Sequence, residues 1–172
     1  MAQVIDGYPQ DMLSVRIRPA TSEDAEPIAR VYLQSAEHHA AIDPERYYVP
    51  DRAAIMERYL TGGQHPRTGP DCITLVADVG NDVAGFVDAR LERPFDPMHR
   101  PMLYCNVVEI TVAAERRSQG IGKLLLEAAE QWGRENGASF LSLEYNTRNP
   151  RAAAFYERLG YEAASMVTSK WL

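Results

Sequence analysis

The chain has 172 residues, a length that suits one domain with a sizeable core. Hydrophobic residues make up 45% of it and charged residues 24%, as is ordinary for a soluble globular protein, and no apolar run is long enough to cross a membrane. The net charge of −6 argues against nucleic acid as a partner, because nucleic acid selects basic surfaces.

The two cysteines, Cys72 and Cys105, lie far apart and have no metal-ligand spacing. We therefore expect no metal site and no disulfide scaffold, and a reducing cytoplasm as the compartment. The first residues lack the basic region and apolar run of a signal peptide. We expect residues 1–13 to form an irregular arm and residues 14–172 to form a single domain.

The first expected elements are a strand and a helix. Residues 14–18, "SVRIR", alternate apolar and charged side chains, as a half-buried strand does. The next residues, "PATSED", favour a helix start with Thr21 or Ser22 as N-cap. Residues 37–51 contain two prolines, which break helices, so we expect a turn region there.

The middle of the chain predicts a second helix and then strands. Gly-Asn-Asp, between two apolar runs, is typical of a β-hairpin turn. A segment with three prolines after the hairpin favours a loop. The expected elements are a helix from Arg52 to about Leu60, a loop at 61–71, hairpin strands at 72–79 and 83–91, a loop at 93–101 and a strand at 102–112.

The C-terminal part predicts two further helices. The stretch 115–133, "ERRSQGIGKLLLEAAEQWG", has apolar residues at helical spacing, and Gly137 closes that helix. In "NPRAAAFYERLG", Asn149 is the expected N-cap, Pro150 the first helical residue, and Gly160 lies past the end. We expect a strand at 138–145 and a weaker strand at 163–172. The order β-α-α-β-β-β-α-β-α-β is a mixed α/β class of α+β type with one strand-helix-strand crossover.

The start of the 115–133 helix has the features of an anion site. A helix N-terminus carries unpaired backbone N–H groups and favours negative charge, and glycines let a ligand approach the backbone. Together they make a pyrophosphate cradle. A P-loop does not fit, because Arg117 stands where its first glycine belongs and Leu124 replaces Ser or Thr. The dinucleotide motif also fails, because its third glycine position is Leu125.

Arg117-Ser-Gln-Gly120-Ile-Gly122 matches Arg/Gln-x-x-Gly-x-Gly/Ala, and in this motif the chain resembles the GCN5-related N-acetyltransferases, the GNAT family. A second family motif is similar at Asn149, Ala152, Phe155, Tyr156, Gly160 and Tyr161. The order of the expected elements resembles that of the family over residues 14–172, and the motifs match over residues 109–161. It implies a central, mostly antiparallel twisted sheet, splayed between strands 4 and 5 and flanked by about four helices.

The resemblance also implies a coenzyme site, with acetyl-CoA as co-substrate and no metal. An amine-bearing small molecule or protein would be the acceptor, with no nucleic acid or membrane partner, and the protein would be a monomer or homodimer. Backbone amides would hold the pyrophosphate, and the main chain of the 102–112 strand would pair with the pantetheine arm. The implied coenzyme-binding residues are Ile110, Thr111, Val112, Arg117, Ser118, Gln119, Gly120, Ile121, Gly122, Lys123, Asn149 and Tyr156.

Acetyl transfer to an amine requires a base for the ammonium proton and an acid for the departing thiolate. Glu109, a carboxylate in an otherwise apolar strand, is the candidate base, although a solvated strand face is an equally good interpretation. In histone-acetylating members the glutamate stands three residues earlier, where this chain has Asn106. Tyr156, at the family's acid position, is the candidate acid.

Other candidates stay open. Glu37, His38 and His39 are alternative bases, as is water bound at Asn106. Cys105 has no recognisable base partner, so we favour direct transfer in a ternary complex over a covalent intermediate. A non-catalytic acyl-CoA-binding sensory domain is the alternative function. Acceptor specificity is expected from 37–51 and 92–101, where the aromatic residues Tyr47, Tyr48, Phe95 and His99 are available to line a pocket.

Overall fold

The computed structural model describes residues 14–60 and 68–170, so the expected arm at 1–13 lies outside the described residues. So do residues 61–67 of the expected loop and the last two residues of the chain. The elements are β1 (Val15–Pro19), a 3₁₀ turn η1 (Ser22–Asp24), α1 (Ala25–Ile42), α2 (Arg52–Leu60), β2 (Thr68–Gly69), β3 (Cys72–Val79), β4 (Asp82–Glu92), β5 (Tyr104–Val112), a 3₁₀ turn η2 (Ala114–Arg116), α3 (Ile121–Glu135), β6 (Leu141–Leu143) and α4 (Pro150–Arg158).

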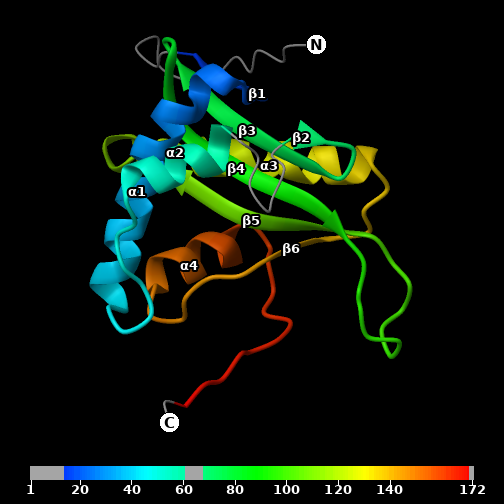
Figure 1. Cartoon of the computed structure of the whole chain (residues 1–172). Coiled ribbons are helices and arrows are strands. Elements are labelled where there is room, and N and C mark those ends of the chain that lie inside the picture. Colours follow the sequence, from blue (N-terminus) through cyan, green and yellow to red (C-terminus); the bar gives the residue numbers. More distant parts are fainter. Residues whose placement is uncertain (1–13, 61–67, 171–172) are drawn as a thin grey trace.

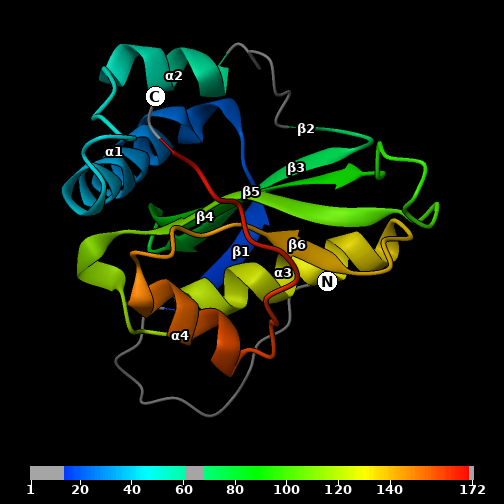
Figure 2. The same ribbon diagram turned by 90° about the horizontal axis from the view of Figure 1, so that it is seen from below.

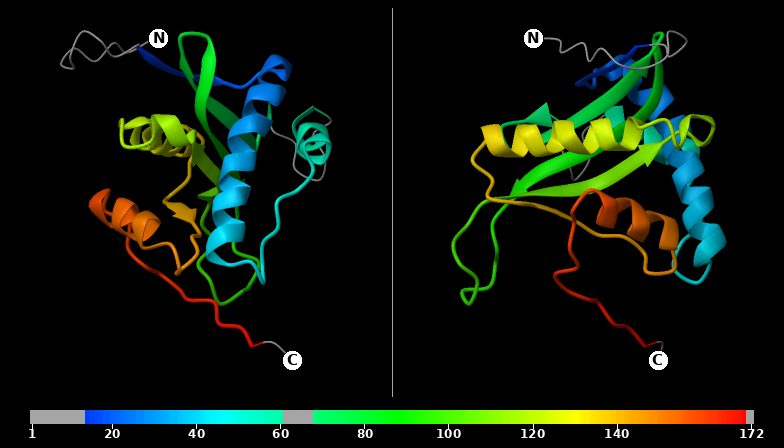
Figure 3. Two further views of the ribbon diagram at one scale, coloured as in Figure 1. Left: turned by 90° about the vertical axis from the view of Figure 1, so that its left-hand side faces the viewer. Right: turned by 180° about the vertical axis from the view of Figure 1, so that it is seen from behind.

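One twisted sheet forms the centre of the fold (Figure 1). Its strand order is β1-β3-β4-β5-β6, with β2 paired to β3, and every pairing is antiparallel except the parallel one between β5 and β6. Helices α1 and α2 cover one face, and α3 and α4 cover the other, as the views from below and from the side show (Figures 2 and 3). The expected mixed α/β class with a mostly antiparallel sheet and four helices is confirmed.

Local signals in the sequence place several element ends correctly. The hairpin between β3 and β4 turns at Gly80 and Asn81, whose φ angles of 62° and 66° fit a two-residue turn with both central residues left-handed. The Asn149 side chain accepts a hydrogen bond of 3.1 Å from the backbone N–H of Ala152 and so caps α4. Gly160 follows that helix at a φ of 86°.

The two faces of the sheet have separate cores. On one face, Leu125 and Leu126 of α3 pack against Val87 and Val107 of the sheet. On the other face, α1 contributes a second cluster that surrounds Phe86. The helix that follows the glycine loop is therefore fixed to the sheet by its apolar side, which holds the loop in place.

A β-bulge interrupts the pairing of β4 with β5. Asp88 pairs with Glu109, but the next residue of β4, Ala89, pairs with Val107. Val108 is therefore an extra residue, and it is 37% exposed.

The bulge changes which face the side chains of β5 point to. Before it, Cys105 and Val107 belong to the core beneath α3; after it, Ile110 and Val112 pack against that same core. Glu109 consequently points to the opposite face, toward α1, where Ser35 contacts it.

The expected turn region at 37–51 is wrong in its first part, because α1 continues to Ile42. Asp43 closes the helix with an N–H to the carbonyl oxygen of His39 at 3.0 Å. Pro44 breaks the helix at its own position. Residues 37–42 contain no proline, so none of them removes a helical hydrogen bond.

Three other expectations need correction. The expected loop at 61–71 includes β2, a two-residue strand that folds back on β3 through Thr68↔Ile73 and Gly69↔Cys72. The expected strand at 138–145 is paired only at Leu141–Leu143. The C-terminal strand is wrong: residues 161–170 form neither helix nor strand, and Met166 and Val167 are 77% and 85% exposed. A strand requires a hydrogen-bonded neighbour, but this segment extends away from the sheet (Figure 1) and lines the cleft described below.

Candidate active site

The parallel strands β5 and β6 separate part of the way along the sheet. Their pairing covers only Cys105↔Leu141 to Val107↔Leu143, whereas β5 continues to Val112. Within the described residues, no strand lies along the outer edge of β5 after Val107. This gap is the splay that the resemblance implies between the family's strands 4 and 5.

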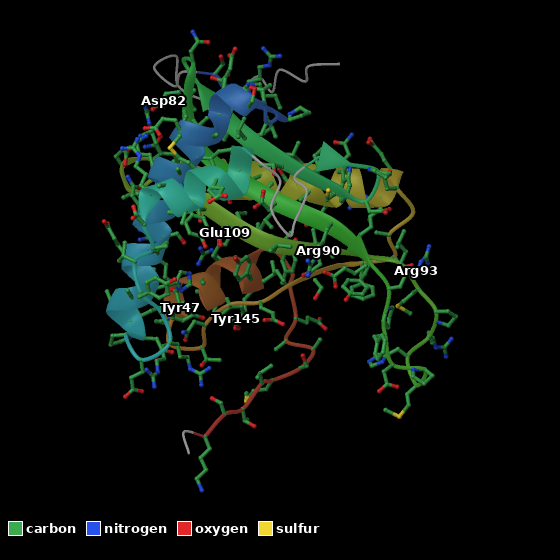
Figure 4. All side chains as sticks on the ribbon, viewed as in Figure 1. Tyr47, Asp82, Arg90, Arg93, Glu109 and Tyr145 are labelled. Atoms are coloured by element: carbon green, nitrogen blue, oxygen red, sulfur yellow. The ribbon has the colours of Figure 1, made fainter. Side chains whose placement is uncertain are left out.

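The gap is part of a cleft of about 1540 Å³. Its walls come from α1 and the segment after it, the second half of β5, the start of α3, β6, α4 and the C-terminal segment (Figure 4). Small-molecule pockets usually enclose about 300–1,000 Å³, so this cleft is larger than a usual pocket for one small ligand.

The glycine loop enters α3 with two left-handed residues. Ser118 has a φ of 63° and Gly120 a φ of 82°, and nothing lies within 4 Å of a Cβ built on Gly120. The first bond of the helix runs from the N–H of Leu124 to Gly120 at 3.2 Å, so the amides between them precede the helical ladder. These amides and the open space at Gly120 fit a bound pyrophosphate.

Gly122 has a different role from Gly120. A Cβ at Gly122 would lie 3.3 Å from Cζ of Phe155, so the absence of a side chain lets α3 and α4 approach closely. The second glycine of the motif therefore brings the two family motifs together in space.

Three basic side chains at the loop and at the start of α4 line the cleft. Arg117 donates from Nε to the main-chain oxygen of Val112 at 3.1 Å, so it is anchored on β5. Lys123 lies 3.6 Å from Glu127 on the exposed side of α3. Arg151, which the sequence analysis missed, donates to the Ser118 hydroxyl at 3.1 Å. Its place in the first turn of α4, two residues after Asn149, is the signal that marks it.

The candidate base is held by hydroxyl groups. Oε1 of Glu109 accepts a hydrogen bond from Thr111 at 2.7 Å and one from Ser35 at 3.4 Å. Glu109 is half-buried and lines the cleft, so the solvated-face interpretation does not describe its surroundings.

The candidate acid is the most buried residue of α4. Tyr156 is 8% exposed, and its ring lies 5.6 Å from that of Tyr145, 5.3 Å from Phe155 and 5.9 Å from Tyr161. Burial, and to a smaller extent the charge of Glu109, raises the pKa of Tyr156 to about 12. The hydroxyl therefore keeps its proton at neutral pH. It lies on the cleft wall within the electrostatic influence of Glu109.

The alternative bases are less well placed. Glu37 is exposed and is not among the residues that line the cleft. His38 and His39 do line it, but Nδ1 of His39 is buried without a hydrogen-bond partner among the described residues. Burial, with a contribution from His38, lowers the pKa of His39. Asn106 donates to Glu92 at 2.8 Å and is thereby engaged outside the cleft.

Cys105 is a core residue. It is 1% exposed, and burial raises the pKa of its thiol to about 11. A thiol that stays protonated and has no access to solvent is a poor nucleophile.

A network centred on Asp43, which the sequence analysis missed, joins two walls of the cleft. The buried Asp43 carboxylate accepts from Arg148 at 3.1 Å and from Asn146 at 3.2 Å, and Arg46 lies 3.5 Å away. On the same side, Nδ2 of Asn149 lies 3.4 Å from a ring nitrogen of His38. The end of α1 is therefore tied to the residues that lead into α4.

The aromatic residues expected at the acceptor site divide into two groups. Tyr47 and Tyr48 line the cleft. Phe95 and His99 do not; Phe95 is fully exposed at 104% in the β4–β5 loop, so this part of the expectation is wrong. That loop extends away from the sheet (Figure 1).

Two further features concern the described part of the chain only. No helix there is long and apolar enough to cross a membrane. Residues 14–60 and 68–170 also hold no group of three His, Cys, Asp or Glu side chains placed to bind a metal ion.

Comparisons with known proteins agree with this geometry. Residues 33–161 match the family model described as the acetyltransferase (GNAT) family. A relative from Bacillus subtilis (strain 168), named uncharacterized N-acetyltransferase YhfO, is 26% identical over 148 residues, which cover 86% of this chain and 90% of that protein.

Solved structures share the fold. A mutant of the BH1408 protein from Bacillus halodurans superposes with a TM-score of 0.81 at 24% identity, covering 91% of this chain and 99% of that one. AAC(6')-Iy, in complex with the bisubstrate analogue CoA-S-monomethyl-acetylneamine, gives a TM-score of 0.69 at 19% identity, covering 92% and 98%.

Proposed function

Because the chain belongs to the acetyltransferase (GNAT) family, we propose that it is an acetyl-CoA-dependent N-acetyltransferase that transfers the acetyl group directly to a primary amine in a ternary complex. The observation that carries this proposal is the position of Glu109 and Tyr156. They come from β5 and α4, line one cleft and influence each other electrostatically.

The residues present fit the coenzyme. The amides of Ile121, Gly122 and Lys123 precede the helical ladder and, with Arg151, offer donors and positive charge to a pyrophosphate. The edge of β5 after Val107, along which no strand of residues 14–60 and 68–170 lies, offers main-chain groups to the pantetheine arm. Val112, whose carbonyl oxygen now accepts from Arg117, would exchange that donor for an amide of the arm.

The chemistry divides among three groups. Glu109 takes the proton of the acceptor's ammonium group, so that the amine nitrogen can attack the acetyl carbon. A backbone N–H of β5 stabilises the negative charge on the carbonyl oxygen. As the carbon–sulfur bond breaks, Tyr156 gives its proton to the departing thiolate. The buried and protonated state of Tyr156 supports the last role, and the buried Cys105 supports direct transfer.

The acceptor in this proposal is an amine in general. The aminoglycoside-derived group of the bound analogue is a ligand of AAC(6')-Iy and is not carried over to this chain. That complex illustrates that this fold can present an amine to coenzyme A.

The test is release of free thiol from acetyl-CoA in the presence of a panel of primary amines, with the acetylated product identified by mass spectrometry. Initial rates at varied concentrations of both substrates should give intersecting double-reciprocal lines, whereas a covalent acetyl-enzyme would give parallel lines. Acetyl-CoA binding without acetylation of any amine in the panel would favour the sensory-domain alternative.

A further inference from the structure

Exposed aromatic side chains gather in the cleft. Tyr48, Tyr47 and Tyr145 are 79%, 41% and 39% exposed, and all three line it. Exposed apolar surface of this kind, gathered in a concave site, marks a place where a ligand buries its own apolar surface.

Two of these tyrosines are linked by contact to the proposed reaction centre and its neighbours. The ring of Tyr145 lies 5.6 Å from that of Tyr156, and the ring of Tyr47 lies 5.0 Å from that of His39. Tyr47, Tyr145 and Glu109, which Figure 4 labels on three different segments of the chain, all line the cleft. A molecule that delivers an amine to Glu109 therefore passes between aromatic surfaces.

The charge of the cleft limits what that molecule can be. The described residues that line it include seven Lys or Arg and five Asp or Glu, although the whole chain has a net charge of −6. Some of the positively charged side chains serve the pyrophosphate. Arg46 and Arg148 lie elsewhere, and both pair with the same buried carboxylate, that of Asp43. Their side chains are 45% and 59% exposed. A second or third positive charge on the acceptor would meet these guanidinium groups.

Resting on the function proposed above, we propose that the acceptor is a primary amine with one positive charge on an apolar, ring-bearing body. Tyr145 and Tyr47 contact the ring, and Glu109 receives the ammonium group. Arg46 and Arg148 select against acceptors with several positive charges, such as polyamines and aminoglycosides.

Three probes test the acceptor class: 2-phenylethylamine, putrescine and kanamycin. Thiol release from acetyl-CoA should give a kcat/KM for 2-phenylethylamine at least about 10-fold above that for either polycation, since a single aromatic contact can supply a factor of this size. Equal or higher kcat/KM for putrescine or kanamycin would overturn the proposal.

Variants separate the ring contact from the chemistry. Tyr145→Ala should lower the kcat/KM for 2-phenylethylamine about 10-fold more than that for ethylamine, which has no ring. Phe95→Ala, an exposed aromatic outside the cleft, is the matched control and should alter neither. An equal loss for both amines in Tyr145→Ala would show that the side chain supports Tyr156 and not the acceptor ring. Arg148→Gln, which can still donate to Asp43, should raise the kcat/KM for putrescine relative to 2-phenylethylamine.

Binding provides a readout that does not depend on turnover. Calorimetry on the complex with coenzyme A should give a lower Kd for 2-phenylethylamine than for putrescine. Absence of that binding preference contradicts the acceptor class. If the preference is present but no amine releases thiol, the proposed function fails and the binding class stands.

Discussion

The hydroxyl group of Thr111 donates a hydrogen bond of 2.7 Å to the carboxylate of Glu109, two residues earlier on the same face of β5. Thr111 is 4% exposed, so this donor is held in place by the packing of the sheet under α1. We predict that Thr111→Val, which keeps the shape and removes the hydroxyl, lowers kcat about 10-fold and leaves the KM for acetyl-CoA unchanged.

A double-mutant cycle checks that Thr111 acts through Glu109. In the Glu109→Gln background, Thr111→Val should have almost no further effect on kcat. Thr111→Ser restores the hydroxyl and should recover most of the activity. Full additivity of the two substitutions would contradict a positioning role.

The role of Glu109 itself is tested by Glu109→Gln. Loss of the base should lower kcat/KM for the amine by about 100-fold or more, the usual size of a general-base effect. Acetyl-CoA affinity, measured by calorimetry, should barely change. Glu135→Gln, at the exposed end of α3, is the control. Unchanged activity of Glu109→Gln would assign proton removal to water or to the histidines of α1.

For Tyr156, we predict that Tyr156→Phe folds normally, since the three ring contacts remain, and lowers kcat roughly 10- to 1000-fold. The KM for acetyl-CoA should change little, because the proton is needed only as the thiolate departs. A pKa of about 12 keeps the hydroxyl protonated across the usual assay range, so the wild-type kcat should not fall at alkaline pH through Tyr156. Wild-type turnover in Tyr156→Phe would exclude the acid role.

The pyrophosphate cradle is tested at Gly120. Gly120→Val places a branched side chain at a φ of 82°, in the space that the ligand would enter. The variant should lose the rise in melting temperature that acetyl-CoA gives the wild type. Gly137→Val is a matched control, because Gly137 has a φ of 83° and lies at the other end of α3. Gly137→Val should be destabilised but should keep the rise in melting temperature with acetyl-CoA. Loss of that rise in both variants would refute a specific role for the loop.

The buried ring of His39 predicts how stability depends on pH. Burial lowers its pKa in the folded state, so the unfolded chain binds more protons as the pH falls through the ordinary value of about 6.5. The stability contributed by the neutral ring is therefore present above that pH and is lost toward the lower folded pKa. His39→Gln should show a smaller drop in melting temperature than the wild type between about pH 7.5 and pH 5.5. An identical drop in both proteins would contradict this assignment.

Sequence patterns predicted those parts of the molecule that local chemistry determines. The Gly-Asn turn, the Asn149 cap and the apolar spacing of α3 each depend on a few neighbouring residues, and each is confirmed. The prediction of a C-terminal strand was wrong because strand formation depends on a neighbouring strand, which the local sequence pattern does not reveal. The Asp43 network was missed for the same reason, since its members Asp43 and Arg148 are 105 residues apart.

The bulge at Val108 has a consequence for comparing strand positions between relatives. In a regular strand, two residues three apart point to opposite faces of the sheet. Here the extra residue between them puts Asn106 and Glu109 on the same face, toward α1 and α2. The family resemblance gives histone-acetylating members a glutamate at the position of Asn106. That carboxylate and one at Glu109 can therefore approach the same side of the sheet from different points on the strand. An alignment that counts residues without this insertion would assign the two positions to opposite sides.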